Sequence, residues 1–114
     1  MKTILIDYLN AHHLPFKDYN DHLIVIYEDK YIHSLSLEYK ENGLTMNVPI
    51  EKDVQDVRLI MKKNLFTTLG HFNYSYEHKK LFYQVSYDLS ERVLSTEMID
   101  ELFLSLKDIQ LLDA

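Results

Sequence analysis

The sequence predicts an α+β fold, in which helices pack on a five-stranded, largely antiparallel sheet. Two observations carry this prediction. Five segments alternate apolar and polar side chains or are rich in β-branched residues, and three other segments repeat apolar residues at helical spacing. The order along the chain is α-βββ-α-ββ-α. Because 114 residues is an ordinary domain length, residues 1–114 are expected to form one domain.

A helix and a strand are expected at the N-terminus. Residues 2–13 carry apolar side chains at helical spacing, and Pro15 ends that segment. After a polar turn at residues 18–21, residues 22–28 read HLIVIYE and are apolar at successive positions. This run predicts a strand that is covered on both faces or lies centrally in the sheet.

A hairpin is expected next. Residues 32–40 alternate apolar and polar side chains, as do residues 43–50, and Asn42-Gly43 between them favours a tight turn. Pro49 has no amide hydrogen to donate, which predicts that this strand end lies at an edge of the sheet.

The central helix is expected to begin at Asp53, whose side chain suits the free backbone amides of a helix start, and to end at Gly70. An α-helix turns by about 100° per residue, so one face of this helix should present an apolar stripe to the sheet. The stripe consists of Val54, Val57, Met61, Leu65 and Leu69.

The C-terminal part is expected to hold two strands and a last helix. Residues 71–77 and 81–89 alternate apolar and polar side chains and are joined by the turn EHKK. Ser95 or Ser90 is expected to cap the last helix, which continues towards Leu112.

The composition limits the functions that the chain can have. It holds 12 Lys and Arg against 18 Asp and Glu, a formal charge of −6, which argues against a nucleic-acid partner because nonspecific affinity comes from basic groups on phosphates. Cysteine is absent, which excludes disulfides and thiolate sites and fits a reducing cytoplasm. No signal peptide is expected, and no apolar run approaches the roughly 20 residues of a membrane helix. We therefore expect a cytoplasmic protein with no membrane partner.

Motifs for catalysis are missing from the sequence. The six histidines form neither an HExxH motif nor an i, i+4 pair on a helix. The carboxylates fall in turns and at helix ends, where a solvated surface explains them. The chain also lacks a glycine-rich phosphate loop and a GxSxG elbow. The sequence therefore predicts a protein that is not an enzyme and holds no metal or cofactor.

Some apolar residues do not fit the predicted stripes. Leu59 and Phe66 are seven residues apart and point away from the sheet-facing stripe, beside Lys62 and Lys63. Two interpretations are open: a loop or the rim of the core accommodates these side chains, or they form an interface. Other elements repeat the pattern, with the off-stripe residues Ile6, Leu9, Phe82, Leu104 and Leu111.

The element order and the segment MKKNLFTTLGHFNYSYEHKKLFYQVSYDLSERVLSTEMIDELFLSL resemble the class I type III secretion chaperones and the wider superfamily of chaperone-like bacterial proteins with their fold. The segment is similar to the family's central helix, which ends in an asparagine and a bulky apolar residue and is followed by a glycine, a strand hairpin and an amphipathic helix. The resemblance covers essentially the whole chain.

The resemblance implies a homodimer and a protein partner. The seam would involve the central helix, here Leu59, Phe66, Lys62 and Lys63. A non-globular segment of the partner would lie along apolar patches of the first helix and the sheet, or pair with an open strand edge.

The expected function is that of a non-catalytic, homodimeric chaperone or adaptor for another protein. Its candidate partner-binding residues are Ile6, Leu9, Phe82, Leu104 and Leu111. The alternative is an inhibitor or immunity-type protein that blocks one target through an acidic, tyrosine-rich surface.

Overall fold

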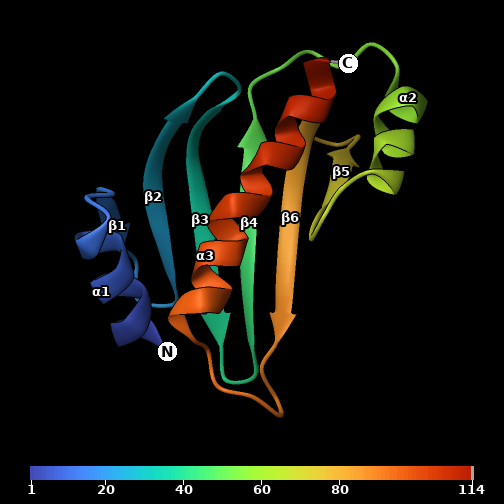
Figure 1. The fold of residues 1–114 in the computed structure, drawn as a ribbon. Helices are drawn as coiled ribbons and strands as arrows, with labels where there is room; N and C mark the ends of the chain where they lie inside the picture. Colours follow the sequence, from blue (N-terminus) through green and yellow to red (C-terminus); the bar gives the residue numbers. More distant parts are fainter. Residues whose placement is uncertain (114) are drawn as a thin grey trace.

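The computed structural model describes residues 1–113 and shows an α+β arrangement of helices on a sheet (Figure 1). Its elements are α1 (Lys2–Ala11), β1 (Phe16–Asp18), β2 (His22–Asp29), β3 (Ile32–Lys40), β4 (Gly43–Ile50), α2 (Val57–Lys62), the 3₁₀ helix η1 (Lys63–Leu65), β5 (His71–Ser75), β6 (Lys80–Asp88), α3 (Thr96–Leu104) and the 3₁₀ helix η2 (Ser105–Asp113). The α+β prediction is confirmed.

The sheet is antiparallel throughout and has the order β1-β2-β3-β4-β6-β5. It therefore has six strands, and the prediction of five is wrong. The missed strand β1 is three residues long and pairs with β2 from Phe16 opposite Val25 to Asp18 opposite Leu23. Three residues are too few to show an alternation, so only the neighbouring strand makes this segment β-structure.

One face of the sheet forms the core with the helices. Alternate residues of β4 and β6 point into it, including Met46 and Val85, which lie opposite each other in the register. Figure 1 shows α3 lying across this sheet, and Tyr8 of α1 donates a hydrogen bond to Asp100 of α3 at 2.6 Å. The two helices thus pack on each other as well as on the strands.

The β2 strand is not covered on both faces, so the first of the two predicted arrangements is wrong, but it lies within the sheet, paired with β1 and β3. Leu23 and Val25 are buried, whereas Ile24 is half-buried and Ile26 is exposed. The face that carries the two isoleucines also carries Ser34 and Ser36 of β3, which pair with them. Apolar residues on both sides of a strand therefore do not show that both sides are covered.

Pro49 lies on a central strand, because β4 is paired with both β3 and β6, and the predicted edge position is wrong. Two residues further on, Glu51 donates its amide to the Tyr31 carbonyl, so the nitrogen of Pro49 also faces β3. The β3–β4 ladder runs only from Lys40 with Gly43 to Ser36 with Asn47. The proline is tolerated because it lies beyond the end of that ladder.

The central helix is shorter than predicted. It begins after Asp56, whose side chain accepts hydrogen bonds from the Arg58 and Leu59 amides, and not after Asp53. The α-helix ends at Lys62 and passes into η1, well before Gly70. The helical stripe therefore does not extend to Leu65 and Leu69, which are exposed.

The last helix begins as predicted, with the Ser95 hydroxyl accepting a hydrogen bond from the Met98 amide. Its α-helical part ends at Leu104, and the chain continues as η2. Through η2 the C-terminal segment stays on the core, where Leu106, Ile109 and Leu112 are buried.

Candidate functional site

Large apolar side chains are exposed on residues 65–69, called here the 65–69 segment, which follows α2 and leads to β5. Leu65 is 83% exposed, Phe66 is 71% exposed and Leu69 is 40% exposed. Exposed apolar residues that are scattered singly need no explanation, but three within five residues form a candidate contact surface.

The backbone at the start of this segment is held by Asn64. Its side-chain amide donates to the Phe72 carbonyl at 3.0 Å, and its side-chain oxygen accepts from the Phe72 amide. The Thr67 hydroxyl donates to the Asn64 carbonyl at 3.1 Å. Asn64 therefore pairs with β5 as a strand residue would, and ties the exposed segment to the sheet.

The end of the segment is held by Asp108 of η2, whose exposed fraction is 4%. This carboxylate accepts a hydrogen bond from the Thr68 amide at 2.8 Å and from the Tyr83 hydroxyl at 2.6 Å, and it also accepts the Thr68 hydroxyl. The Tyr83 oxygen in turn accepts from the Gly70 amide at 3.1 Å. The carboxylate thus connects the loop, β6 and η2.

A groove of about 290 Å³ lies between the 65–69 segment and the C-terminal helices. Leu69 lines it from one side and Leu104, which is 65% exposed, from the other. Glu101 and Lys107 also line it, so two leucines lie beside one acidic and one basic side chain. Protein interfaces likewise combine apolar with polar side chains.

Leu59 of α2 lies at a second hollow. This residue is 57% exposed and lines a hollow of about 500 Å³ together with Asp53, Asp56, Lys63 and Leu112. Lys62 is exposed. Neither Leu59 nor Phe66 is tucked under a loop, so a position at the rim of the core and an interface are the two interpretations that fit their exposure.

The predicted partner-binding residues differ in their exposure. Leu9 is fully buried on the face of α1 that packs on the core. It is therefore not part of an exposed patch, and the prediction is wrong at this residue. Ile6 and Leu111 are half-buried and pack against the core. Phe82 is half-buried on the opposite face of the sheet, where it pairs with Pro49 and Asn73. Of this set, Leu104 is the exposed residue.

Buried tyrosines hold the acidic side chains of the C-terminal helices. Burial, and next the hydrogen bond to Asp108, raise the pKa of Tyr83 above 10.0. Burial, and next the hydrogen bond to Glu101, raise the pKa of Tyr87 to about 12. Burial followed by the bond to Asp100 raises the pKa of Tyr8. Asp100, Glu101 and Asp108 therefore hold tyrosine hydroxyls, whereas the sequence pattern indicates solvated carboxylates.

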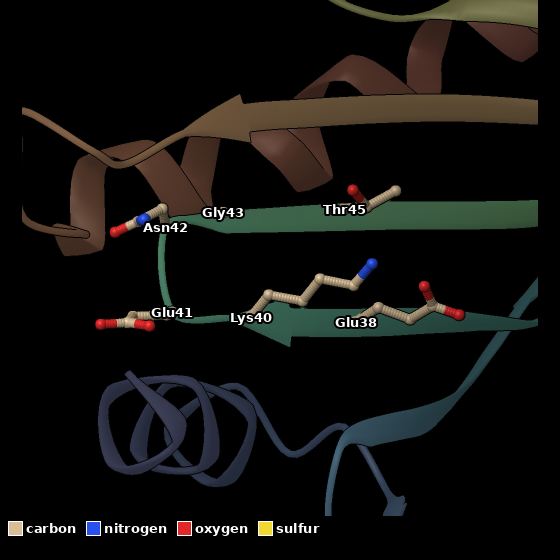
Figure 2. Close-up of a pocket in the computed structure, with 6 residues that line it drawn as sticks. All are labelled: Glu38, Lys40, Glu41, Asn42, Gly43 and Thr45. Atoms are coloured by element: carbon tan, nitrogen blue, oxygen red, sulfur yellow. The ribbon is translucent and has the colours of Figure 1, made fainter.

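A third hollow lies at the β3–β4 hairpin and is polar (Figure 2). Its lining residues are Glu38, Lys40, Glu41, Asn42, Gly43 and Thr45. Figure 2 shows the Lys40 side chain extending along the two strands between Glu38 and Thr45. An apolar segment of a partner would gain little here, because contact with it would remove polar groups from water.

Within residues 1–113, no group of three or more His, Asp or Glu side chains is placed to hold a metal ion. Over the same residues, every helix is too short or too polar to cross a membrane.

The sequence did not identify Leu65 and Leu69 as exposed residues, nor Asn64 and Asp108 as the residues that hold the segment between them. A signal for the first pair is present: Thr67 and Thr68 are β-branched and precede Gly70, and these residue types disfavour continuation of a helix. The contact of Thr68 with Asp108 joins positions 40 residues apart, and a sequence pattern gives no sign of it.

Neither protein-family models nor curated proteins match the sequence. Two solved structures are similar. One is the crystal structure of YbjN from E. coli, for which a role as a transcription regulator has been suggested; it has a TM-score of 0.71 and 12% identity and covers 97% of this chain and 87% of that chain. The other is a chain in the HopA1–SchA chaperone–effector complex, with a TM-score of 0.68, 16% identity, and coverage of 94% of this chain and 87% of that chain. The chain therefore has a fold shared with these proteins, and its resemblance to the chaperone-like superfamily is confirmed at the level of the fold.

Proposed function

We propose that this protein binds another protein and acts as a chaperone or adaptor without catalysis. The observation that carries the proposal is the groove between Leu69 and Leu104, whose apolar side chains are exposed on a backbone fixed by hydrogen bonds. A fixed apolar surface binds well because little conformational entropy is lost when the partner arrives. The partner segment would place apolar side chains between these leucines. A chaperone–effector complex among the proteins of similar fold supports this function.

The test is affinity capture from the native lysate with the wild-type protein and with Leu69→Asp/Leu104→Asp. We expect the wild type to retain a partner and the double variant to lose it. Val93→Asp is the matched control, because Val93 is exposed but lies in the β6–α3 connection, outside the groove. Retention of the same partner by the double variant would contradict the assignment of the groove.

The kind of partner decides between two functions. An extended or disordered segment of a larger protein supports the chaperone or adaptor in the cytoplasm. A folded target supports an inhibitor or immunity-type protein, for which the exposed Tyr19 and Tyr76 provide suitable contact area. Limited proteolysis of the captured partner, alone and in the complex, distinguishes the two.

The homodimer belongs to the same proposal, with Leu59, Lys62, Lys63 and Phe66 at the seam. Asp53 and Asp56 lie just before α2, Lys62 ends it, and Lys63 begins η1. A two-fold axis that pairs two α2 helices in opposite directions would place acidic ends beside basic ends. Light scattering after gel filtration should give a dimer mass, and Leu59→Asp/Phe66→Asp should give a folded monomer. A wild-type monomer at tens of micromolar would rule out this dimer.

A further inference from the structure

We propose that Asp108 is a positioning residue, which holds the 65–69 segment in the geometry that displays its apolar side chains. This inference rests on the proposed function, since the displayed side chains matter only if a partner contacts them. Asp108 itself is not proposed to touch the partner. It acts through Thr68 and Tyr83, which connect it to the apolar groove.

The Asp108 side chain accepts hydrogen bonds from residues outside its own helix, η2. The carboxylate accepts from a backbone amide and two hydroxyl groups that belong to Thr68 and Tyr83, on two other parts of the chain. A buried carboxylate is costly unless such donors surround it. Its presence in the core therefore fixes the positions of its donors, and the Thr68 amide is one residue from Leu69.

The same hydrogen-bond network also fixes Gly70, the residue that follows Leu69. The Gly70 amide donates to the Tyr83 oxygen at 3.1 Å. A Cβ on Gly70 would lie 2.5 Å from the Gln84 carbonyl oxygen and 2.6 Å from the Tyr83 ring, so the backbone here is pressed against β6. Leu69 thus stands between two residues whose amides are both bound within the network. An exposed leucine in this setting cannot withdraw into the core, because its backbone has no freedom to turn.

The groove and the network share residues. Thr68 lines the groove beside Leu69, while Leu104 lines it from the end of α3, four residues before Asp108. Loss of the Asp108 contacts would therefore separate the two walls of the groove. The core beneath the central strands would keep its own contacts, since Leu37 and Met46 pair within the β3–β4 ladder.

The test measures amide hydrogen exchange by NMR in wild type and Asp108→Ala. We expect the Thr68 and Gly70 amides to exchange at least tenfold faster in the variant, while the Leu37 amide keeps its wild-type rate. Asp100→Ala is the matched control: Asp100 also accepts a tyrosine hydroxyl at 2.6 Å, but from Tyr8 of α1. It should leave the Thr68 and Gly70 amides unchanged.

A milder pair of variants covers the case in which Asp108→Ala does not fold. Thr68→Val removes the hydroxyl that reaches Asp108, and Thr68→Ser keeps it. Faster exchange at Thr68 and Gly70 in the valine variant only, with Leu37 unchanged, supports the proposal. Unchanged exchange, or an equal increase at Leu37, overturns it, because Asp108 would then have no local role or only a general stabilising one.

The binding arm uses N-acetyl-leucinamide as an apolar probe and follows the methyl resonances of Leu69 and Leu104. Saturable shifts in the wild type, with an affinity for the probe that falls at least threefold in Asp108→Ala or Thr68→Val, support the positioning role. Equal affinity in wild type and variants overturns it. Absence of shifts in wild type would instead count against the proposed groove, and the exchange rates would still decide whether Asp108 fixes the segment.

Discussion

At the scale of single residues, two polar side chains, the half-buried Asn64 and the buried Asp108, decide where apolar side chains are exposed. The side chain of Asn64, which precedes the 65–69 segment, binds the backbone of Phe72, and Asp108 binds the Thr68 amide, while the leucines and the phenylalanine of the segment remain outside. The hydrophobic effect alone would favour their burial. The hydrogen bonds oppose this, because turning the segment inward would leave buried polar groups without partners.

Asn64→Ala is expected to lower the free energy of unfolding by about 1 to 3 kcal/mol, because the amide and carbonyl of buried Phe72 lose their partner. Urea unfolding followed by circular dichroism measures it. Asn73→Ala is the control, since its side chain bonds Gln84 at 3.2 Å on the exposed face, and it should change the free energy by less than about 0.5 kcal/mol. Equal losses in the two variants would contradict the assigned role of Asn64.

Gly70→Ala tests the close approach of the chain to β6. A Cβ at this position would meet the Gln84 carbonyl at 2.5 Å, and a carbonyl cannot move aside as the end of a side chain can. We expect a loss of about 1 to 3 kcal/mol in the free energy of unfolding, as for overpacked sites. Gly43→Ala is the comparison: its Cβ would lie 3.3 Å from the Tyr87 carbonyl, and the loss should be smaller. A neutral Gly70→Ala would show that the backbone can withdraw from β6.

At the scale of elements, α2 shows how a short helix depends on its ends. Six residues form too few internal hydrogen bonds to make the helix stable alone. The Asp56 carboxylate satisfies two free amides, those of Arg58 and Leu59, and the buried Ile60 attaches the helix to the core. The exposed side chains of α2 are thereby held in place although most of the helix surface faces outward.

Asp56→Ala should lower the free energy of unfolding by about 1 kcal/mol, because the cap of α2 is lost. Asp53→Ala should change it by less than about 0.5 kcal/mol, since this residue precedes the helix and does not cap it. Thermal or urea unfolding of the two variants gives the comparison directly. A larger loss at Asp53 would place the start of the helix where the sequence pattern indicated.

At the scale of the whole molecule, three tyrosine–carboxylate pairs join the C-terminal helices to α1 and the sheet. Tyr8 binds Asp100, Tyr83 binds Asp108 and Tyr87 binds Glu101. Burial is the main cause of the raised pKa of each tyrosine. The unfolded chain would ionise these groups near pH 10.0, whereas the folded chain keeps them protonated to higher pH.

The stability of the fold should therefore be complete below pH 10.0 and fall as the pH rises above it. Urea unfolding at a series of alkaline pH values measures this slope. Tyr87→Phe removes a group with a pKa of about 12 and should make the slope shallower, while Tyr76→Phe, at an exposed position, should leave it unchanged. The same slope in wild type and Tyr87→Phe would exclude Tyr87 as a source of the loss.

The sequence by itself determined the helices and strands whose apolar residues repeat at regular spacing. The strands β2, β3, β4, β5 and β6, the Asn42-Gly43 turn, α1 and the start of α3 at Ser95 were predictable, because alternation, turn residues and caps act over a few neighbouring positions. The exposure of Leu59 also agrees with its predicted position away from the sheet-facing stripe, whereas Phe66 lies beyond the end of α2. The net charge and the absence of cysteine likewise restrict the classes of function that suit the chain, because both are properties of composition and need no contact between distant residues.

Only the tertiary structure decided the rest. The strand β1 exists because β2 lies beside it, Pro49 is central because β6 pairs with β4, and Leu9 is buried because α1 packs on the core. Leu65 and Leu69 are outside because Asn64 binds Phe72 and Asp108 binds Thr68. In each case the partner group is distant in the chain or lies in another element. A local pattern records the preference of a segment, whereas the contact that satisfies or overrides that preference is formed only when the chain folds.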